Sequence, residues 1–325
     1  MKRRALLTLL GGSIVSWPMM TRAQVRARLG YLSGGRKGDN GANTVDVLQG
    51  SLRELGWRRG ETIEIDERWA AGDFATLPRL AGELVALRPD VLVSTGTTET
   101  RALQTLTGTI PIVFMQLAVD PVSLGFVKTI ARPGGNITGF MQGPHFLWGK
   151  RIELLTELLG RAPRRLAWLG NPGNAGSEAN WADARDAAAS IGSELIRVDV
   201  STAREIDRAF GTLKGRDALL VQFDFLFAVE RKRVAALVAQ QRLPAVYENR
   251  MQAQGGGLMS YGGDLRENYR QGAQYVHRIL NGAAPGDLPV VQASRFELVV
   301  NARTARTLGL PVPAALLARA DEVIE

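Results

Sequence analysis

The chain has 325 residues, with 40 Lys and Arg against 32 Asp and Glu, a formal net charge of +8, and no cysteine. The lack of cysteine excludes disulfides, thiolate metal sites and cysteine nucleophiles. Because the basic residues are scattered among acids and no basic run is interleaved with stacking aromatics, the sequence also argues against a nucleic-acid partner.

Residues 1–23 have the pattern of a secretory signal peptide. Lys2, Arg3 and Arg4 form a basic start, and residues 5–15 form an apolar run too short to span a bilayer. Thr21-Arg22-Ala23 leaves small residues at the positions that a signal peptidase reads, with the expected cleavage after Ala23. The paired arginines leave both the Sec and the twin-arginine export routes open. Cleavage leaves 36 basic and 32 acidic residues. We expect a periplasmic protein that is not tethered by a lipid-bearing cysteine.

The remaining sequence alternates short apolar runs with helical patterns, which is typical of parallel sheets joined by helical crossovers. Strands are expected at 28–33, 62–69, 90–94, 110–115, 165–170, 194–200, 218–221, 245–248, 258–261 and 296–300. Helices are expected at 44–55, 77–87, 101–106, 149–159, 181–191, 203–213, 229–240 and 265–280, with a final helix at 316–324.

A turn-rich break at 131–136 separates two such series, and about 300 residues exceed what one core usually serves. We therefore predict an α/β fold of two doubly wound parallel-sheet lobes joined by a hinge that the chain crosses several times. The first lobe is expected to contain 24–139 plus 262–290, and the second 140–261 plus 291–325.

No catalytic motif is complete in this sequence. The two histidines, His145 and His277, are too far apart for a helical metal pair, and Leu258 stands where a GxSxG elbow needs its first glycine. Residues 30–36 lack the Lys-Ser/Thr end of a phosphate loop. We expect a protein that is not an enzyme and has no cofactor, with a secreted α/β hydrolase as the weaker alternative.

Several short strings keep a characteristic order and spacing over almost the whole chain. They are 9–12, 110–114, 120–122, 131–139 (ARPGGNITG), 171–172, 260–262 and 317–325 (LARADEVIE). Together they resemble the tryptophan/tyrosine-type substrate-binding proteins of ATP-binding-cassette importers, which have the type I periplasmic binding protein fold. The resemblance implies a monomer that closes on an aromatic or other amino acid, or a carboxylate, and that serves a membrane permease and its ATPase.

Ligands of open parallel sheets bind beyond the carboxyl ends of the strands, which gives a list of candidate residues in the first lobe. Thr95, Gly96, Thr97 and Thr98 lead from a strand into a helix, whose N-terminus suits a carboxylate; helix capping is the alternative. The equivalent residues after the first strand are Ser33 and Gly34, and those near the fourth strand and after the break are Gln116, Asp120 and Gln142. Asp120 suits either an ammonium group or a cap.

The second lobe offers a matching set of candidates. Asn171, Asp224 and Glu248 lie just past strand ends, and Phe225 adds apolar surface beside Asp224. A carboxylate beside an aromatic wall is suited to an amino-acid-like ligand, although Asp224 is also a good helix cap. Tyr261 is expected to serve as hinge, wall or both. We expect ligand to stabilise a closed form of the two lobes, and delivery to a membrane receptor instead of a permease remains an alternative.

Overall fold

The computed structural model describes residues 26–38, 43–143 and 147–325. The predicted signal peptide and His145 lie outside these residues. In the described part of the chain, no helix has the length and apolar character needed to cross a membrane.

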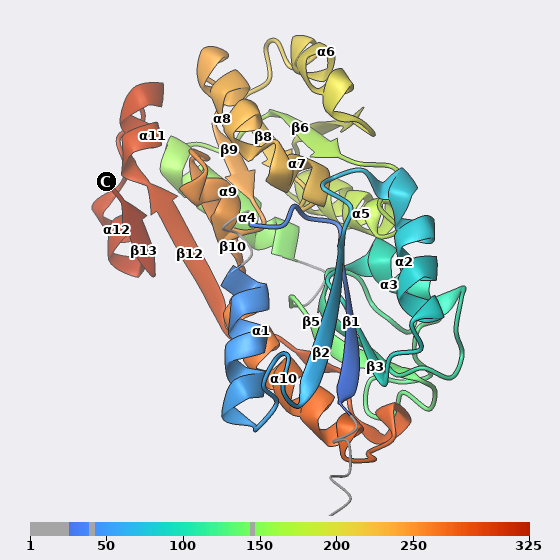
Figure 1. The fold of residues 1–325 in the computed structure, drawn as a ribbon. Helices are drawn as coiled ribbons and strands as arrows, with labels where there is room; N and C mark the ends of the chain where they lie inside the picture. Colours follow the sequence, from blue (N-terminus) through green and yellow to red (C-terminus); the bar gives the residue numbers. More distant parts are fainter. Residues whose placement is uncertain (1–25, 39–42, 144–146) are drawn as a thin grey trace, which may run out of the picture.

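The first lobe is built on a six-stranded sheet in the order β11-β5-β4-β3-β1-β2, with every pair parallel. Its strands are β1 (Ala27–Ser33), β2 (Ile63–Trp69), β3 (Val91–Ser94), β4 (Ile112–Leu117), β5 (Ile137–Met141) and β11 (Val291–Gln292). Helices α1 (Asn43–Glu54) and α10 (Leu265–Leu280) pack on one face. On the other face lie α2 (Leu77–Ala86) and α3 (Thr97–Gln104) (Figure 1).

The second lobe is built on a seven-stranded sheet in the order β13-β12-β10-β9-β8-β6-β7. Its strands are β6 (Arg165–Gly170), β7 (Glu194–Asp199), β8 (Ala218–Val221), β9 (Ala245–Tyr247), β10 (Met259–Gly263), β12 (Phe296–Asn301) and β13 (Glu322–Ile324). The one antiparallel pairing in this sheet joins β10 and β12, so β12 and its parallel neighbour β13 run opposite to the other five strands. Its α-helices are α4 (Leu147–Leu159), α5 (Ser177–Ser190), α6 (Ile206–Gly211), α7 (Phe225–Val229), α8 (Arg231–Gln240), α9 (Arg250–Gln254), α11 (Ala302–Leu308) and α12 (Ala314–Arg319).

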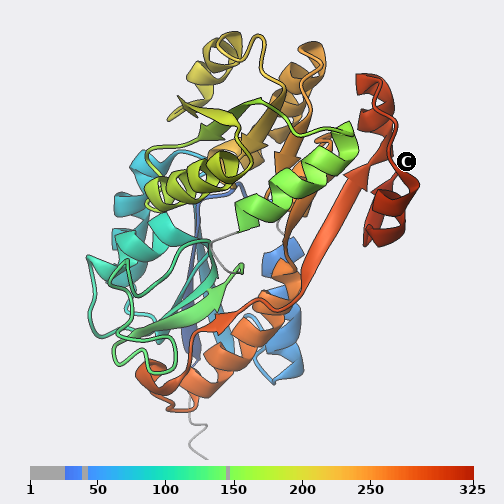
Figure 2. The ribbon, with the colours of Figure 1, turned by 180° about the vertical axis from the view of Figure 1, so that it is seen from behind.

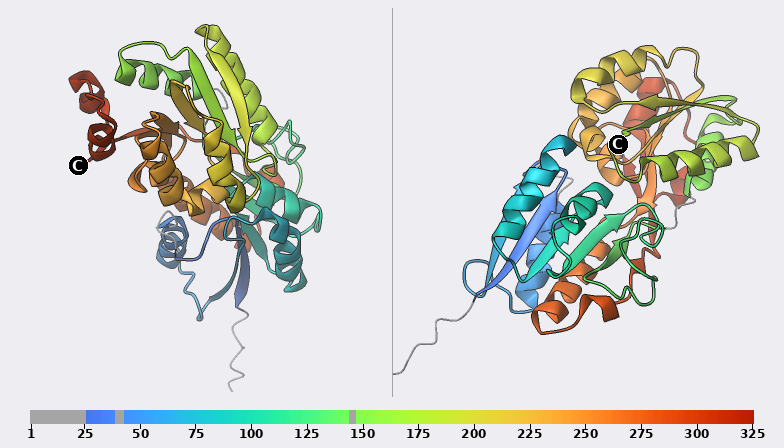
Figure 3. Two further views of the ribbon diagram at one scale, coloured as in Figure 1. Left: turned by 90° about the horizontal axis from the view of Figure 1, so that it is seen from above. Right: turned by 90° about the vertical axis from the view of Figure 1, so that its right-hand side faces the viewer.

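Each sheet is covered by apolar side chains on both faces, which is why its central strands read as continuous apolar runs. In the second lobe, one core contains Trp148, Trp168 and Leu316, and the core on the opposite face contains Phe210 and Phe227. The predicted fold class, two doubly wound α/β lobes, is confirmed (Figure 3).

The chain passes between the sheets three times: from β5 to α4, from β10 to α10, and from β11 to β12. The long strand β12 leaves this hinge and rises into the second lobe (Figure 2). The passages meet at Gly263, where an added Cβ would lie 2.2 Å from the Gln142 carbonyl oxygen and 3.1 Å from the Ala293 Cβ. We propose that these three passages are the lobe boundaries, a few residues from the predicted ones.

Two predicted elements differ from the structure. The expected final helix at 316–324 is wrong: α12 ends at Arg319 and the chain continues as strand β13, paired with β12. The reason is Asp321, whose side chain accepts the Leu298 backbone N–H at 2.8 Å and turns the chain onto the sheet edge. The helix expected at 229–240 is divided at Glu230 into α7 and α8.

Candidate functional site

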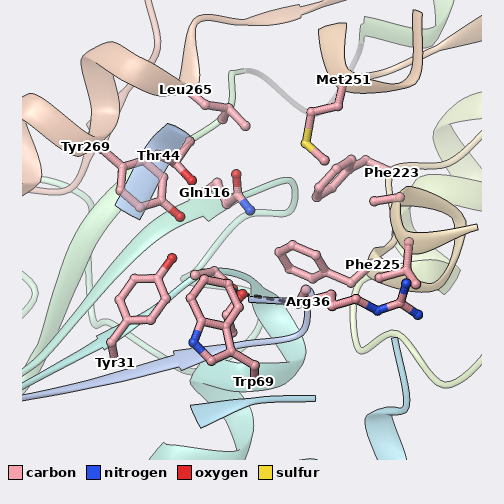
Figure 4. Close-up of a pocket in the computed structure, with 15 residues that line it drawn as sticks. Tyr31, Arg36, Thr44, Trp69, Gln116, Phe223, Phe225, Met251, Leu265 and Tyr269 are labelled. Carbon is pink, nitrogen blue, oxygen red and sulfur yellow. Dashed lines mark hydrogen bonds between the residues drawn. The ribbon is translucent and has the colours of Figure 1, made fainter. Parts of the chain in front are cut away.

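Three adjoining cavities lie between the carboxyl edges of the two sheets. The aromatic cavity is lined by Tyr31, Ser33, Gly35, Arg36, Thr44, Trp69, Thr95, Gln116, Phe223, Phe225, Ala228, Val229, Met251, Leu265 and Tyr269 (Figure 4). The carboxylate cavity is lined by Phe74, Gly96, Thr97, Glu99, Gln116, Ala118, Gln142, Asn174, Asn180, Gln222, Phe223, Asp224 and Phe225. The hinge cavity is lined by Ala118, Gln142, Gly143, Leu147, Arg151, Asn180, Glu248 and Gly263. The carboxylate cavity shares lining residues with each of the other two, so the three cavities adjoin along one cleft.

The aromatic cavity has ring walls from both lobes. Tyr31 and Trp69 stand on neighbouring strands of the first lobe with ring centroids 5.3 Å apart, and Phe223 and Phe225 follow β8 in the second with centroids 5.3 Å apart. Tyr269 on α10 directs its hydroxyl toward that of Tyr31, with which it is hydrogen-bonded (Figure 4). Such a cavity suits a flat aromatic group, because its faces and edges offer matching ring contacts.

Glu99 is buried in the carboxylate cavity on the first turn of α3. Its Oε1 accepts the Gly34 backbone N–H at 2.7 Å and the Thr95 hydroxyl at 3.3 Å, and the carboxylate also accepts its own backbone N–H. The side chain therefore occupies the N-terminus of its own helix, where the sequence had suggested a ligand carboxylate. Burial raises the pKa of the Glu99 carboxyl to about 7, and nearby Asp224 adds to the rise.

Asp224 faces the same cavity from the second lobe and is equally buried. It is the cap of α7, accepting the Leu226 backbone N–H at 2.9 Å, and it also accepts the side-chain amides of Asn171 at 3.1 Å and Asn174 at 2.8 Å. Burial raises the pKa of its carboxyl to about 6 against these hydrogen bonds. Capping and ligand contact, which the sequence presented as alternatives, are compatible in this geometry.

Neither carboxylate forms an ion pair within the described part of the chain. Two buried acids from opposite lobes thus line one cavity without a compensating cation. A buried charge of this kind is costly unless it is paired. The arrangement therefore favours a ligand that carries a positive group.

The hinge cavity contains a buried cation, Arg151 on α4. Its guanidinium lies 4.6 Å from the ring centroid of Trp148, donates from Nε to the Tyr261 carbonyl oxygen at 2.9 Å, and has Nη2 3.3 Å from the Glu248 carboxylate. Glu248 Oε1 also accepts the Phe223 backbone N–H at 2.8 Å. Burial lowers the pKa of Arg151 against the attraction of Glu248.

Three glutamine side chains place unpartnered polar atoms along the cleft. Gln116 Oε1, Gln142 Nε2 and Gln222 Nε2 are buried and have no hydrogen-bond partner among the residues that the structure describes. In Gln222 the oxygen accepts the Asn171 backbone N–H at 3.3 Å, which leaves its Nε2 as a donor. Buried polar groups in native proteins are normally hydrogen-bonded, so these three atoms leave hydrogen-bonding capacity for a polar ligand in the cleft.

The two lobes touch directly across the cleft. The Ala175 backbone N–H in the second lobe donates to Thr98 Oγ1 in the first at 3.1 Å. A Cβ added at Gly176 would lie 2.7 Å from Val119 Cγ2 on the other side, so only glycine permits this approach. The structure is the closed arrangement.

The structure brings most of the predicted residues to the cleft. Those lining at least one cavity are Ser33, Thr95, Gly96, Thr97, Gln116, Gln142, Asp224, Phe225 and Glu248. Gly34 and Asn171 hold the two acids, and Thr98 joins the lobes. Asp120 caps its own loop through the Val122 backbone N–H, and Tyr261 stacks on Phe296 with centroids 5.9 Å apart; neither lines these cavities.

Sequence reasoning missed Glu99, Arg151 and the ring wall of the first lobe. Tyr31, Trp69 and Tyr269 resemble ordinary core residues in strands and helices. Glu99 lies in the first turn of a helix, where an acid is commonly explained by its favourable interaction with the helix dipole. The available signal was position: Tyr31 and Trp69 stand near the carboxyl ends of parallel strands, where ligands bind.

A model of the family described as ABC transporter substrate binding protein matches residues 37–324. A curated relative, the tyrosine-binding protein of Clostridioides difficile (strain R20291), is 26% identical over 261 residues, which cover 80% of this chain and 74% of the relative.

Two solved structures share the fold. A conserved domain protein from Vibrio cholerae O1 biovar El Tor is 29% identical with a TM-score of 0.83, over 91% of this chain and 99% of that one. An ABC domain in complex with L-Trp from Streptococcus pneumonia is 24% identical with a TM-score of 0.84, over 92% of this chain and 100% of that one.

Proposed function

The chain belongs to the ABC transporter substrate binding protein family, and from this premise we propose that it captures an aromatic amino acid and delivers it to a membrane permease. The family consists of binding proteins, so the chain is not an enzyme. In the proposal, residues 1–23 direct export to the periplasm and are removed. The closed form then docks as a monomer on the permease, whose ATPase drives transport.

One observation carries the choice of ligand: two buried, unpaired carboxylates adjoin a cavity walled by rings from both lobes. Glu99 and Asp224 suit an ammonium group, because hydrogen bonds between charged groups are roughly twice as strong as neutral ones. Tyr31, Trp69 and Phe225 suit an aromatic side chain. The relatives that bind tyrosine and L-Trp support the same ligand class.

We propose that the contacts with the ligand come from all three cavities. The ring would lie among Tyr31, Trp69, Phe223, Phe225 and Tyr269, with Ser33, Thr95 and Gln116 at its polar edge. The ammonium group would lie between Glu99 and Asp224, near Thr97. Binding joins the lobes, so the ligand stabilises the closed form through its greater affinity for that form.

A thermal-shift screen of residues 24–325 tests this function. The ligands are L-tryptophan, L-tyrosine and L-phenylalanine, with L-leucine as the apolar control and N-acetyl-L-tryptophan as the control without an ammonium group. A ligand at 100 times its Kd adds about 2.7 kcal/mol to the free energy of unfolding. We expect a shift with at least one free aromatic amino acid and none with the acetylated one. Equal shifts with the acetylated compound, or a shift with L-leucine alone, would contradict the proposal.

A further inference from the structure

The proposed ligand carries a carboxylate as well as an ammonium group, and two helix N-termini of the cleft are already filled. Glu99 occupies the N-terminus of α3 and Asp224 that of α7. A second anion placed beside these acids would be repelled. The ligand carboxylate must therefore be bound elsewhere in the cleft.

The hinge cavity has the complementary chemistry. Arg151, only 3% exposed, lines it together with Gln142. Gln142 Nε2 has no partner, and Gln222 Nε2, also without a partner, lies in the adjoining carboxylate cavity. The carboxylate and hinge cavities share Gln142 and Asn180, so one small ligand can reach both. A guanidinium and free amide donors are the groups that bind a carboxylate.

We propose that the hinge cavity is the subsite for the ligand carboxylate, with Arg151 as the residue that makes the cleft specific for an amino acid over the corresponding amine. This inference rests on the proposed function, because it takes the aromatic ring and the ammonium group as already placed. It assigns the three cavities in order to the ring, the ammonium group and the carboxylate.

The position of Arg151 also connects this subsite to the hinge. Its Nε is bonded to the carbonyl oxygen of Tyr261, in the strand that leads to Gly263, where the three passages meet. Gln142 stands at the first passage, directly after β5. A carboxylate bound here contacts both passages and favours the arrangement in which they lie together.

The charges of Glu248 and Asp183 both act on Arg151, and of these two acids Glu248 lines the hinge cavity. Glu248 lies 3.3 Å from Arg151 and competes with a ligand carboxylate for the guanidinium. Removing its charge should therefore strengthen binding of a carboxylate ligand, whereas removing the charge of Arg151 should weaken it. Opposite effects from two residues in contact are difficult to explain by a purely structural role.

The test measures the dissociation constants of L-tryptophan and tryptamine, and of L-tyrosine and tyramine, by calorimetry with the full mature chain. For wild type we expect each amino acid to bind at least about tenfold more tightly than its amine. Arg151→Gln should weaken the amino acid by about 10 to 100-fold and the amine by less than about twofold. Glu248→Gln should strengthen the amino acid alone. Gln142→Leu repeats the test without removing a buried charge, in case Arg151→Gln does not fold.

Arg197→Gln is the matched control. Arg197 also stacks on a tryptophan, Trp168 at 5.6 Å, and pairs with carboxylates, yet it does not line the cleft. Its loss should leave all four dissociation constants unchanged. Two results would contradict the proposed carboxylate subsite. One is equal affinity of wild type for the amino acid and its amine, and the other is an equal loss of affinity for both ligands in Arg151→Gln and Gln142→Leu. If neither class bound wild type, the proposed function would fail as well.

Discussion

Glu99 and Asp224 are the residues on which the chemistry of the cleft depends. Each acid accepts backbone N–H groups at the start of a helix and is held in place by neighbouring polar groups. The positions are therefore fixed before a ligand arrives, so little side-chain entropy is lost on binding. In the described part of the chain neither acid is paired with a cation, and in the proposed function the ligand supplies one.

The raised pKa values of these acids predict that ligand affinity rises with pH. Burial lifts the pKa of Glu99 to about 7 and that of Asp224 to about 6, above their usual values of 4.5 and 3.8. The closed, ligand-free form therefore holds protons that the solvated acids release. The contribution of these two acids to the stability of the closed form is fully present below about pH 4 and is lost as pH rises through 6 to 7. An ammonium group is bound by ionised carboxylate, so its binding to the protonated closed form below pH 7 must release protons.

The measurement is the dissociation constant of the aromatic amino acid between pH 5 and 8, with proton release obtained by calorimetry in two buffers of different ionisation enthalpy. We expect tighter binding at pH 8 than at pH 5.5 and proton release that fades above pH 7. Glu99→Gln should reduce the proton release and the pH dependence. A constant affinity without proton release would show that the acids do not bind a cation.

The sequence singled out Asp224 because a carboxylate beside an aromatic wall suits an amino-acid-like ligand, and it gave helix capping as the alternative role. The sequence did not predict Glu99 or Arg151. Glu99 matters because it has no cationic partner among the described residues, and Arg151 matters because it is buried beside Glu248. Whether a helical Glu lacks a cation, or a helical Arg is buried at a hinge, depends on packing between lobes that are distant in the chain. Local patterns do not contain that information.

At the scale of elements, closure depends on the start of α5 meeting the loop after β4. Gly176 lies at the N-cap of α5 with φ of −96°, which any residue adopts, so the glycine is required for space alone. Its nearest neighbour is Val119 Cγ2 of the other lobe. The open form has no such contact, since the lobes are apart.

Gly176→Ala should therefore weaken ligand binding with little effect on the stability of the ligand-free protein. The added methyl group would lie 2.7 Å from Val119, and overpacking of this kind costs about 1 to 3 kcal/mol. Gly50→Ala, in α1 with open space around it, is the control and should leave affinity unchanged. The comparison uses calorimetric affinity and the urea unfolding of the ligand-free proteins. Unchanged affinity in Gly176→Ala would mean that this contact is not made in the liganded form.

The helices and strands were predicted well where a helix follows each strand, because the alternation of short apolar runs with helical patterns indicates where each strand and each helix lies. Strand β5 was missed because no helix separates it from β4: the chain returns through the loop at 118–136. Strand β13 was mistaken for helix because its three residues follow the apolar helix α12 without a glycine or proline. Strand β13 forms through pairing with β12, which is distant in the sequence, and the hydrophobic periodicity of the local sequence does not reveal such pairing.

At the scale of the whole molecule, the unpaired acids oppose closure in the absence of ligand. At neutral pH the closed form must either bury negative charge or take up protons, and the open form does neither. The open form should therefore dominate until a cation supplies the difference in free energy. In the proposed function, the ligand supplies the positive charge that the described interface between the lobes lacks.

Small-angle scattering of residues 24–325 checks this expectation. The closed form should have a radius of gyration of roughly 19 Å, and the ligand-free protein at pH 7.5 should be larger. Addition of ligand, or acidification to pH 5 without ligand, should shift the protein toward the smaller value. Equal radii in all three conditions would show that the lobes do not separate.

The three passages through the hinge also bear on the order in which the protein can be made. The first sheet receives its edge strand β11 and its covering helix α10 only after most of the second lobe has been synthesised. The second sheet is completed by β13, at residues 322–324. Neither lobe can finish folding as the chain emerges, so both are completed together and late. The first sheet therefore lacks its edge strand β11 until residues 291–292 are made, and the second lacks its edge strand β13 until residues 322–324 are made.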